Sequence, residues 1–237
     1  YDVKLTITHI RIENMHIGLI IDAFLIISAL SLLIINALHI QGGLIQLTLA
    51  LLVTSLLSGY ALLNIFGLTR YFSRIENAVL SYILSYAFTG FITLASFSID
   101  QGARTLFALS TFILLGLISA LKHRRHKYSV ISRPIPKNIN SLALLLAMAF
   151  YGLSFYFMYP DFTLLPGTDI SRHYASSIIL GRTPDLYIGS VYLLAHLHES
   201  MFLTLSNPSL VSAQTALVTL NLMLPLAFFV MAKSYLE

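Results

Sequence analysis

Long apolar runs constrain the fold of this chain more than any other feature of its sequence. Of its 237 residues, 57% are hydrophobic and only 10% are charged, and the mean hydropathy is +0.82. Several of the runs reach the roughly 20 residues that a helix needs to cross a bilayer. The composition therefore predicts an all-α, polytopic membrane protein and argues against a soluble domain.

Six membrane spans are predicted from these runs. They cover approximately residues 17–38, 44–66, 77–97, 105–121, 141–159 and 212–231. Ahead of the first span, residues 1–14 begin with alternating apolar and polar side chains, which predicts a short strand or a polar lead-in. Ser73 and Glu76 have the spacing of a capping box and open the third span.

A further apolar stretch, residues 186–205, carries His196, His198 and Glu199 near its centre. Ionisable groups in that position make a poor span. An amphipathic helix lying at the membrane interface fits the pattern better. We therefore expect one or two external interfacial helices here, in addition to the six spans.

The lysines and arginines predict the orientation of the chain. If the amino end is cytoplasmic and residues 186–205 do not span, eleven of the 14 face inward, whereas Arg104, Arg172 and Arg182 face outward. This asymmetry is what the positive-inside rule expects. The basic stretch at 122–137 is then a cytoplasmic loop that touches anionic lipid rather than nucleic acid, and the loop at 160–185 is external.

Asp22 and three small residues are the notable features within the first three spans. Asp22 lies about one and a half turns into the first span, and an acid inside a span suggests a function by default. Its place near the interface favours a structural role instead, with the carboxylate reaching the lipid headgroups. Gly59, Ser81 and Ser85 are suited to close packing between helices.

The densest group of reactive side chains is Pro166-Gly-Thr-Asp-Ile-Ser-Arg-His-Tyr174. Thr168 is a suitable N-cap for a helix, on which Asp169 and His173 share a face beside Arg172. An acid, an imidazole and a guanidinium at a helix N-terminus can hold a metal ion or a phosphate. The alternative is a capped surface helix with a local ion pair.

Two parts of the chain resemble known families. Residues 15–127 resemble a four-helix membrane module of unknown function from prokaryotic, often archaeal, proteins. That resemblance rests on Ser58-Gly-Tyr-Ala-Leu-Leu, where proline usually precedes Gly-Tyr, and on Ile75-Glu-Asn. After a cytoplasmic linker at 128–139, residues 140–237 resemble the start of a GT-C glycosyltransferase. There, Pro166-Gly-Thr-Asp-x-x-x-His matches the entrance of that family's large external loop, here 160–208.

The GT-C resemblance implies a function and a set of site residues. It implies transfer of a sugar from a polyprenyl-phosphate carrier to an exported acceptor, with Asp169 on the family's catalytic or metal-associated acid. Arg172 would contact the carrier phosphate, and His173 would assist Asp169. Further candidates are Arg182 and Tyr174 for substrate binding, and His196, His198 and Glu199, with Asp169, for a divalent Mg or Mn ion.

Two functional classes stay open from the sequence. The first is a membrane glycosyltransferase, of which this chain is expected to be a fragment, with a lipid-linked sugar donor and membrane lipids as its partners. The second is a non-catalytic scaffold or assembly subunit with a GT-C-like loop. A transporter is less favoured, because the spans show no obvious inverted repeat and few central charges.

The predicted orientation can be tested by cysteine labelling, because the chain contains no cysteine. Val130→Cys should be protected from a membrane-impermeant thiol reagent in intact cells, and Thr163→Cys should react. Labelling at position 130 but not at position 163 would invert the predicted topology.

Overall fold

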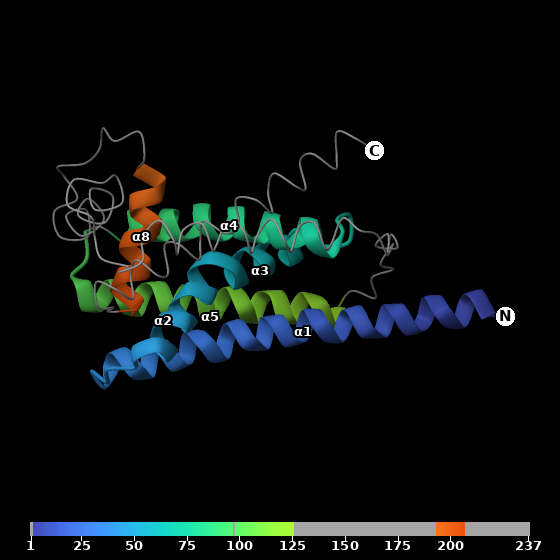
Figure 1. Cartoon of the computed structure of the whole chain (residues 1–237), viewed down its shortest axis with the longest axis horizontal. Coiled ribbons are helices and arrows are strands. Elements are labelled where there is room, and N and C mark those ends of the chain that lie inside the picture. The colour runs from blue at the N-terminus through green and yellow to red at the C-terminus, as the bar shows by residue number, and fades with distance from the viewer. Residues whose placement is uncertain (1, 97, 126–192, 207–237) are drawn as a thin grey trace, which may run out of the picture.

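The computed structural model describes residues 2–96, 98–125 and 193–206, and every structural statement below concerns these residues. All the regular elements in them are helices, shown in Figure 1. In chain order they are α1 (Asp2–Ala37), α2 (Gly43–Leu52), the π-helical turn η1 (Val53–Leu57), α3 (Ser58–Ile65), α4 (Arg74–Ala95), α5 (Gln101–Arg125) and α8 (Leu193–Ser206).

Four of the predicted spans coincide with helices that are long and apolar enough to cross a membrane. These helical stretches are Ile17–Ala37, Gly43–Ile65, Arg74–Ala95 and Gln101–His123. The second stretch is continuous through α2, η1 and α3. The prediction of an all-helical chain with helices suited to crossing a membrane is confirmed for the described part of the chain, whereas the fifth and sixth predicted spans lie outside it.

The amino-terminal stretch is helical from Asp2, so the strand interpretation of residues 1–14 is wrong. These residues continue into the first span as one helix, and Figure 1 shows α1 extending beyond α4 and α5 at its amino end. A helix that enters a membrane without a break keeps its backbone hydrogen bonds within one segment, which a single strand cannot do.

Side-chain caps define where α4 and α5 begin. The capping box of α4 is confirmed: Ser73 Oγ accepts from the Glu76 backbone N–H, and Glu76 Oε2 accepts from the Ser73 N–H at 2.6 Å. At the start of α5, Asp100 Oδ1 accepts from the backbone N–H groups of Gly102 and Ala103. Each cap satisfies backbone donors that lack a partner in the first turn of a helix.

One apolar core runs through the described helices. It includes Leu25 and Leu32 of α1, Phe112 of α5, and Met201 and Phe202 of α8. Burying such side chains stabilises the packing of α8 on the four spans by roughly 1.5–3 kcal/mol each when the alternative is water. The described segment of the predicted GT-C-like part, α8, thus shares a core with the four-helix module.

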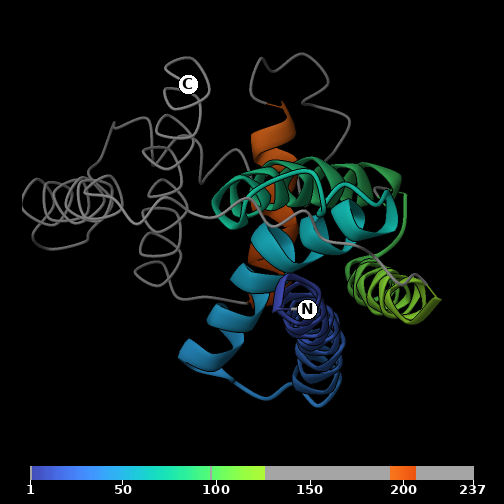
Figure 2. The same ribbon diagram turned by 90° about the vertical axis from the view of Figure 1, so that its right-hand side faces the viewer.

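Helix α8 runs crosswise to α1 and α5, as both ribbon views show (Figures 1 and 2). Its 14 residues extend about 21 Å, less than the roughly 30 Å of a bilayer core. It is not among the four helices suited to spanning. Because residues 186–192 lie outside the described part, the interfacial placement of the whole stretch 186–205 stays a prediction.

Small residues let α3 and α4 approach until their backbones are in contact, as expected. A Cβ atom on Gly59 would lie 1.8 Å from the Ser81 carbonyl oxygen and 2.6 Å from the Ser85 nitrogen. The Ser85 hydroxyl in turn accepts from the Gly59 N–H at 2.6 Å and from Ser58 Oγ at 3.0 Å. The contact therefore has no room for a side chain at position 59.

Gly59→Ala should destabilise the protein by about 3 kcal/mol or more, because backbone atoms rather than a flexible side chain oppose the new methyl group. Thermal unfolding in detergent measures the loss. Gly102→Ala is the matched control, since its Cβ would meet only the Asp100 carboxylate, at 3.3 Å. Equal melting temperatures for the two variants would contradict this account of the α3–α4 contact.

Candidate functional site

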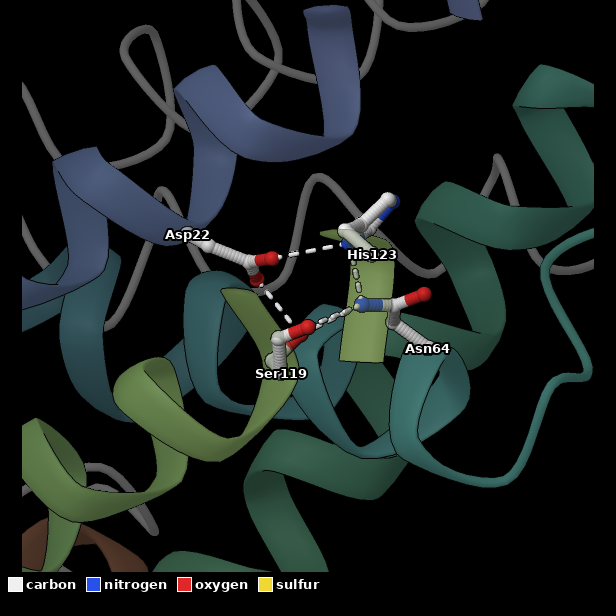
Figure 3. A network of polar contacts seen from close by, with 4 residues as sticks. All are labelled: Asp22, Asn64, Ser119 and His123. Atoms are coloured by element: carbon white, nitrogen blue, oxygen red, sulfur yellow. Dashed lines mark hydrogen bonds and ion pairs between the residues drawn. The ribbon is translucent and has the colours of Figure 1, made fainter. Parts of the chain in front are cut away.

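Four polar side chains from three helices form a buried network around the Asp22 carboxylate (Figure 3). Ser119 Oγ donates to Asp22 Oδ1 at 2.6 Å, and His123 Nδ1 lies 3.0 Å from Asp22 Oδ2. Asn64 Nδ2 lies 2.6 Å from Ser119 Oγ and 3.1 Å from the Ser119 carbonyl oxygen, and it also contacts His123 Nδ1. The network joins α1, α3 and α5 at one end of the bundle.

The donors and acceptors around the Asp22 carboxylate can be ordered, although Asn64 Nδ2 and His123 Nδ1 lie in contact and are both donors in that order. The two amide hydrogens of Asn64 go to the hydroxyl and carbonyl oxygens of Ser119, and the Ser119 hydroxyl then donates to Asp22. An ionised carboxylate only accepts, so His123 donates its Nδ1 hydrogen to the second carboxylate oxygen. Each oxygen of Asp22 thus has one donor from α5.

Glycines make the space that this network occupies. A Cβ on Gly18 would lie 2.1 Å from His123 Nε2, so the imidazole rests against the bare backbone of α1. A Cβ on Gly116 would lie 2.7 Å from Ile26 and 3.4 Å from the Asp22 carbonyl oxygen. These two close approaches hold α1 against α5 on either side of the carboxylate.

Burial makes this network sensitive to charge. The side chain of Asp22 is fully buried and that of His123 is 8% exposed. A lone charge in such a place is costly, whereas a hydrogen-bonded carboxylate–imidazole pair offsets much of that cost. The arrangement can exchange a proton between the carboxylate and the imidazole. It lacks the contact of a serine nucleophile with its base, because Ser119 bonds to Asp22 rather than to His123.

The structure corrects the interpretation of Asp22. The carboxylate faces the bundle interior and does not reach the headgroups, because Ser119 and His123 supply polar partners within the core. The sequence analysis missed Asn64, Ser119 and His123, the last because it lies in a basic run. The alternating direction of the spans could have indicated these partners. The start of the first span lies on the same side of the bundle as the ends of the second and fourth spans. An acid there needs a partner from a neighbouring span.

A second polar cluster attaches α8 to the other helices. His198 Nε2 lies 3.1 Å from the Thr54 carbonyl oxygen and 3.2 Å from Ser55 Oγ, and its ring stacks on Tyr86 with 4.3 Å between centroids. Thr54 and Ser55 belong to η1, where the π-helical turn changes the backbone hydrogen-bond pattern. The Thr54 carbonyl also accepts from the Thr89 hydroxyl of α4 at 2.9 Å.

These contacts define the state of His198. Because a carbonyl oxygen can only accept, Nε2 carries the hydrogen and Nδ1 keeps its lone pair, which has no hydrogen-bond partner among the described residues. Burial lowers the pKa of His198 to about 4, although the Thr54 carbonyl acts in the opposite direction. The imidazole is therefore neutral near pH 7.

Backbone carbonyls of α8 are also held by side chains from three other elements. Thr93 of α4 donates to the Leu197 carbonyl oxygen at 2.9 Å. In the last turn, the Leu205 carbonyl oxygen accepts from Gln46 of α2 at 2.9 Å and from Asn36 of α1 at 3.2 Å. These bonds satisfy carbonyls at the end of a buried helix and fix α8 along its length.

Most of the predicted site residues lie outside the described part of the chain. They are Asp169, Arg172, His173, Tyr174 and Arg182. His196 is described only as part of the α8 backbone, and Glu199 is partly exposed one residue after His198. Within the described residues, no group of three His, Asp or Glu side chains is placed to hold a metal ion. The predicted Mg or Mn site stays a prediction.

Comparison with known proteins does not assign the chain to a family, because no family model, curated protein or solved structure matches it.

Ser119→Ala should destabilise the protein by roughly 1–3 kcal/mol, because it removes the donor to Asp22 Oδ1 and the hydroxyl acceptor of Asn64 Nδ2. Ser28→Ala is the matched control: Ser28 is equally buried, but its hydroxyl has no hydrogen-bond partner among the described residues. Its removal should change stability little. Thermal unfolding of both variants in detergent checks this, and an equal loss would show that Ser119 does not support the network.

Proposed function

We propose that this chain belongs to an integral membrane glycosyltransferase that uses a polyprenyl-phosphate sugar, and that its four-helix part is a scaffold rather than a catalytic domain. The scaffold role rests on one observation, the burial of α8 in the core formed by the four spans. The catalytic role rests on the external loop predicted at 160–208.

The contacts of α8 support the scaffold role. Met201, Phe202 and Leu205 are fully buried in the common core, and His198 is fully buried against η1 and Tyr86. Polar anchors come from α1, α2 and α4 as well as η1. A helix held by so many partners has a defined position relative to the spans. The four-helix part can therefore position the segments that are connected to α8.

The chemistry of the stretch around Asp169 supports the catalytic role. A carboxylate can deprotonate an acceptor hydroxyl or hold a divalent cation against a leaving phosphate. Arg172 suits the phosphate of a lipid carrier, because guanidinium pairs with phosphate oxygens through two parallel hydrogen bonds. With the predicted topology, this stretch faces the exterior at headgroup depth, where a lipid-linked donor is accessible.

The scaffold without catalysis is the second candidate, because the same α8 contacts support it and require no chemistry. The two candidates differ in one respect: only the glycosyltransferase needs the acid at position 169. In both cases the amino end is proposed to be cytoplasmic and loop 160–185 external.

Asp169→Asn tests the catalytic role, because it keeps the shape of the side chain and removes its charge. We expect the full-length protein in native membranes to lose transfer from a polyprenyl-phosphate sugar while its membrane insertion and melting temperature stay unchanged. Full transfer by Asp169→Asn would reject Asp169 as the catalytic acid. Asp161, another acid of the predicted external loop, would be tested next.

Phe202→Ala is the contrasting variant. Removing this fully buried ring should cost roughly 3–5 kcal/mol of stability and should lower transfer only through loss of folded protein. Normal melting of Phe202→Ala would contradict the scaffold role. Absence of any transfer by the unmodified protein, together with loss of stability in Phe202→Ala, would leave the scaffold as the supported function.

A further inference from the structure

We propose that Asp22 and His123 together form a proton-binding site within the membrane bundle, and that the number of protons it holds controls the contact between α1 and α5. The proposal does not depend on sugar transfer. It rests on a carboxylate and an imidazole in direct contact, on their burial, and on the way the two helices close around them.

The pair is neutral only when it holds one proton. With one proton, either the carboxylate and imidazolium charges cancel or both groups are uncharged, and the 3.0 Å contact is satisfied in both cases. A second proton leaves a net charge of +1, and loss of the proton leaves −1. Either net charge is costly in a site where Asp22 is fully buried.

The described groups near the pair show how such a charge is met. Among the described residues, Tyr60 of α3 interacts electrostatically with Asp22, and Lys122 directly precedes His123 on α5. The Lys122 ammonium is directed to the Ile65 carbonyl oxygen at the end of α3. Ser119 and Asn64 supply hydrogen bonds but no charge. In this proposal, a net charge on the pair is relieved by hydration, which accompanies separation of α1 and α5.

The geometry also provides a route for the proton and a consequence for the fold. The exposed 8% of His123 admits exchange through the imidazole, since Asp22 has no exposed surface. The imidazole rests on Gly18, so movement of the ring displaces the backbone of α1 directly. Because α1 continues to Asp2 as one helix, opening at this site would move its protruding amino-terminal part.

Two buried serines without hydrogen-bond partners among the described residues provide reporters in a chain without cysteine. Ser28 lies six residues beyond Asp22 on α1, and Ser81 lies at the Gly59 contact between α3 and α4. Ser28→Cys reports opening near the pair, and Ser81→Cys reports a buried site elsewhere in the bundle. The measured quantity is the ratio of their rates of reaction with a membrane-permeant thiol reagent, in the full chain reconstituted in vesicles.

The ratio of the Ser28→Cys reaction rate to the Ser81→Cys reaction rate should be lowest at intermediate pH. It should rise toward both ends of a series from about pH 4 to about pH 10. At each end of the series the rate ratio should change by close to about tenfold per pH unit, because an opening linked to one proton cannot change more steeply with pH. A ratio independent of pH would overturn the proposal.

Two variants test which residue causes the acid rise of the rate ratio and which causes the alkaline rise. Asp22→Asn can no longer become negative, so the alkaline rise should disappear and the acid rise should stay. The imidazole can accept from the new amide by changing its tautomer, so this variant should fold. His123→Gln should show the reverse, with a ratio that falls toward acid because protonation of Asp22 then makes the site neutral. Persistence of the alkaline rise in Asp22→Asn, or of the acid rise in His123→Gln, would also overturn the proposal.

Discussion

The packing of the described bundle depends on the cost of placing a carboxylate inside it. Asp22 is fully buried on α1, and its two oxygens are satisfied by Ser119 and His123 of α5. An apolar contact between two helices in a membrane tolerates rotation and sliding, because lipid tails are as apolar as leucine. A carboxylate with two specific donors does not, so this network defines the register of α1 against α5.

Other polar contacts extend the same principle through the bundle. The Ser58, Gly59 and Ser85 contact fixes α3 against α4, and the Thr54 carbonyl brings together a hydroxyl from α4 and an imidazole from α8. In each case a polar group buried in an apolar region has one placement that satisfies it. The apolar residues supply most of the contact area, and these polar groups select one arrangement among those that the area would allow.

The neutrality of His198 and the proposed proton dependence of His123 illustrate how placement determines the role of a side chain. His198 donates to a carbonyl and is fully buried, which lowers its pKa and keeps it neutral. His123 contacts the Asp22 carboxylate at 3.0 Å, and its proposed proton dependence rests on that contact. The two residues would therefore respond differently to pH within one bundle.

The sequence by itself determined the four described spans to within a few residues, the capping box of α4 and the close approach at Gly59. These follow from local composition, because an apolar run of sufficient length, a capping residue or a missing Cβ acts within or next to its own helix. The tertiary structure decided which side chains meet. Asp22 and His123 are 101 residues apart, and Ser55 and His198 are 143 apart. Such pairings depend on how the helices rotate and cross, and hydropathy along the chain carries no information about rotation.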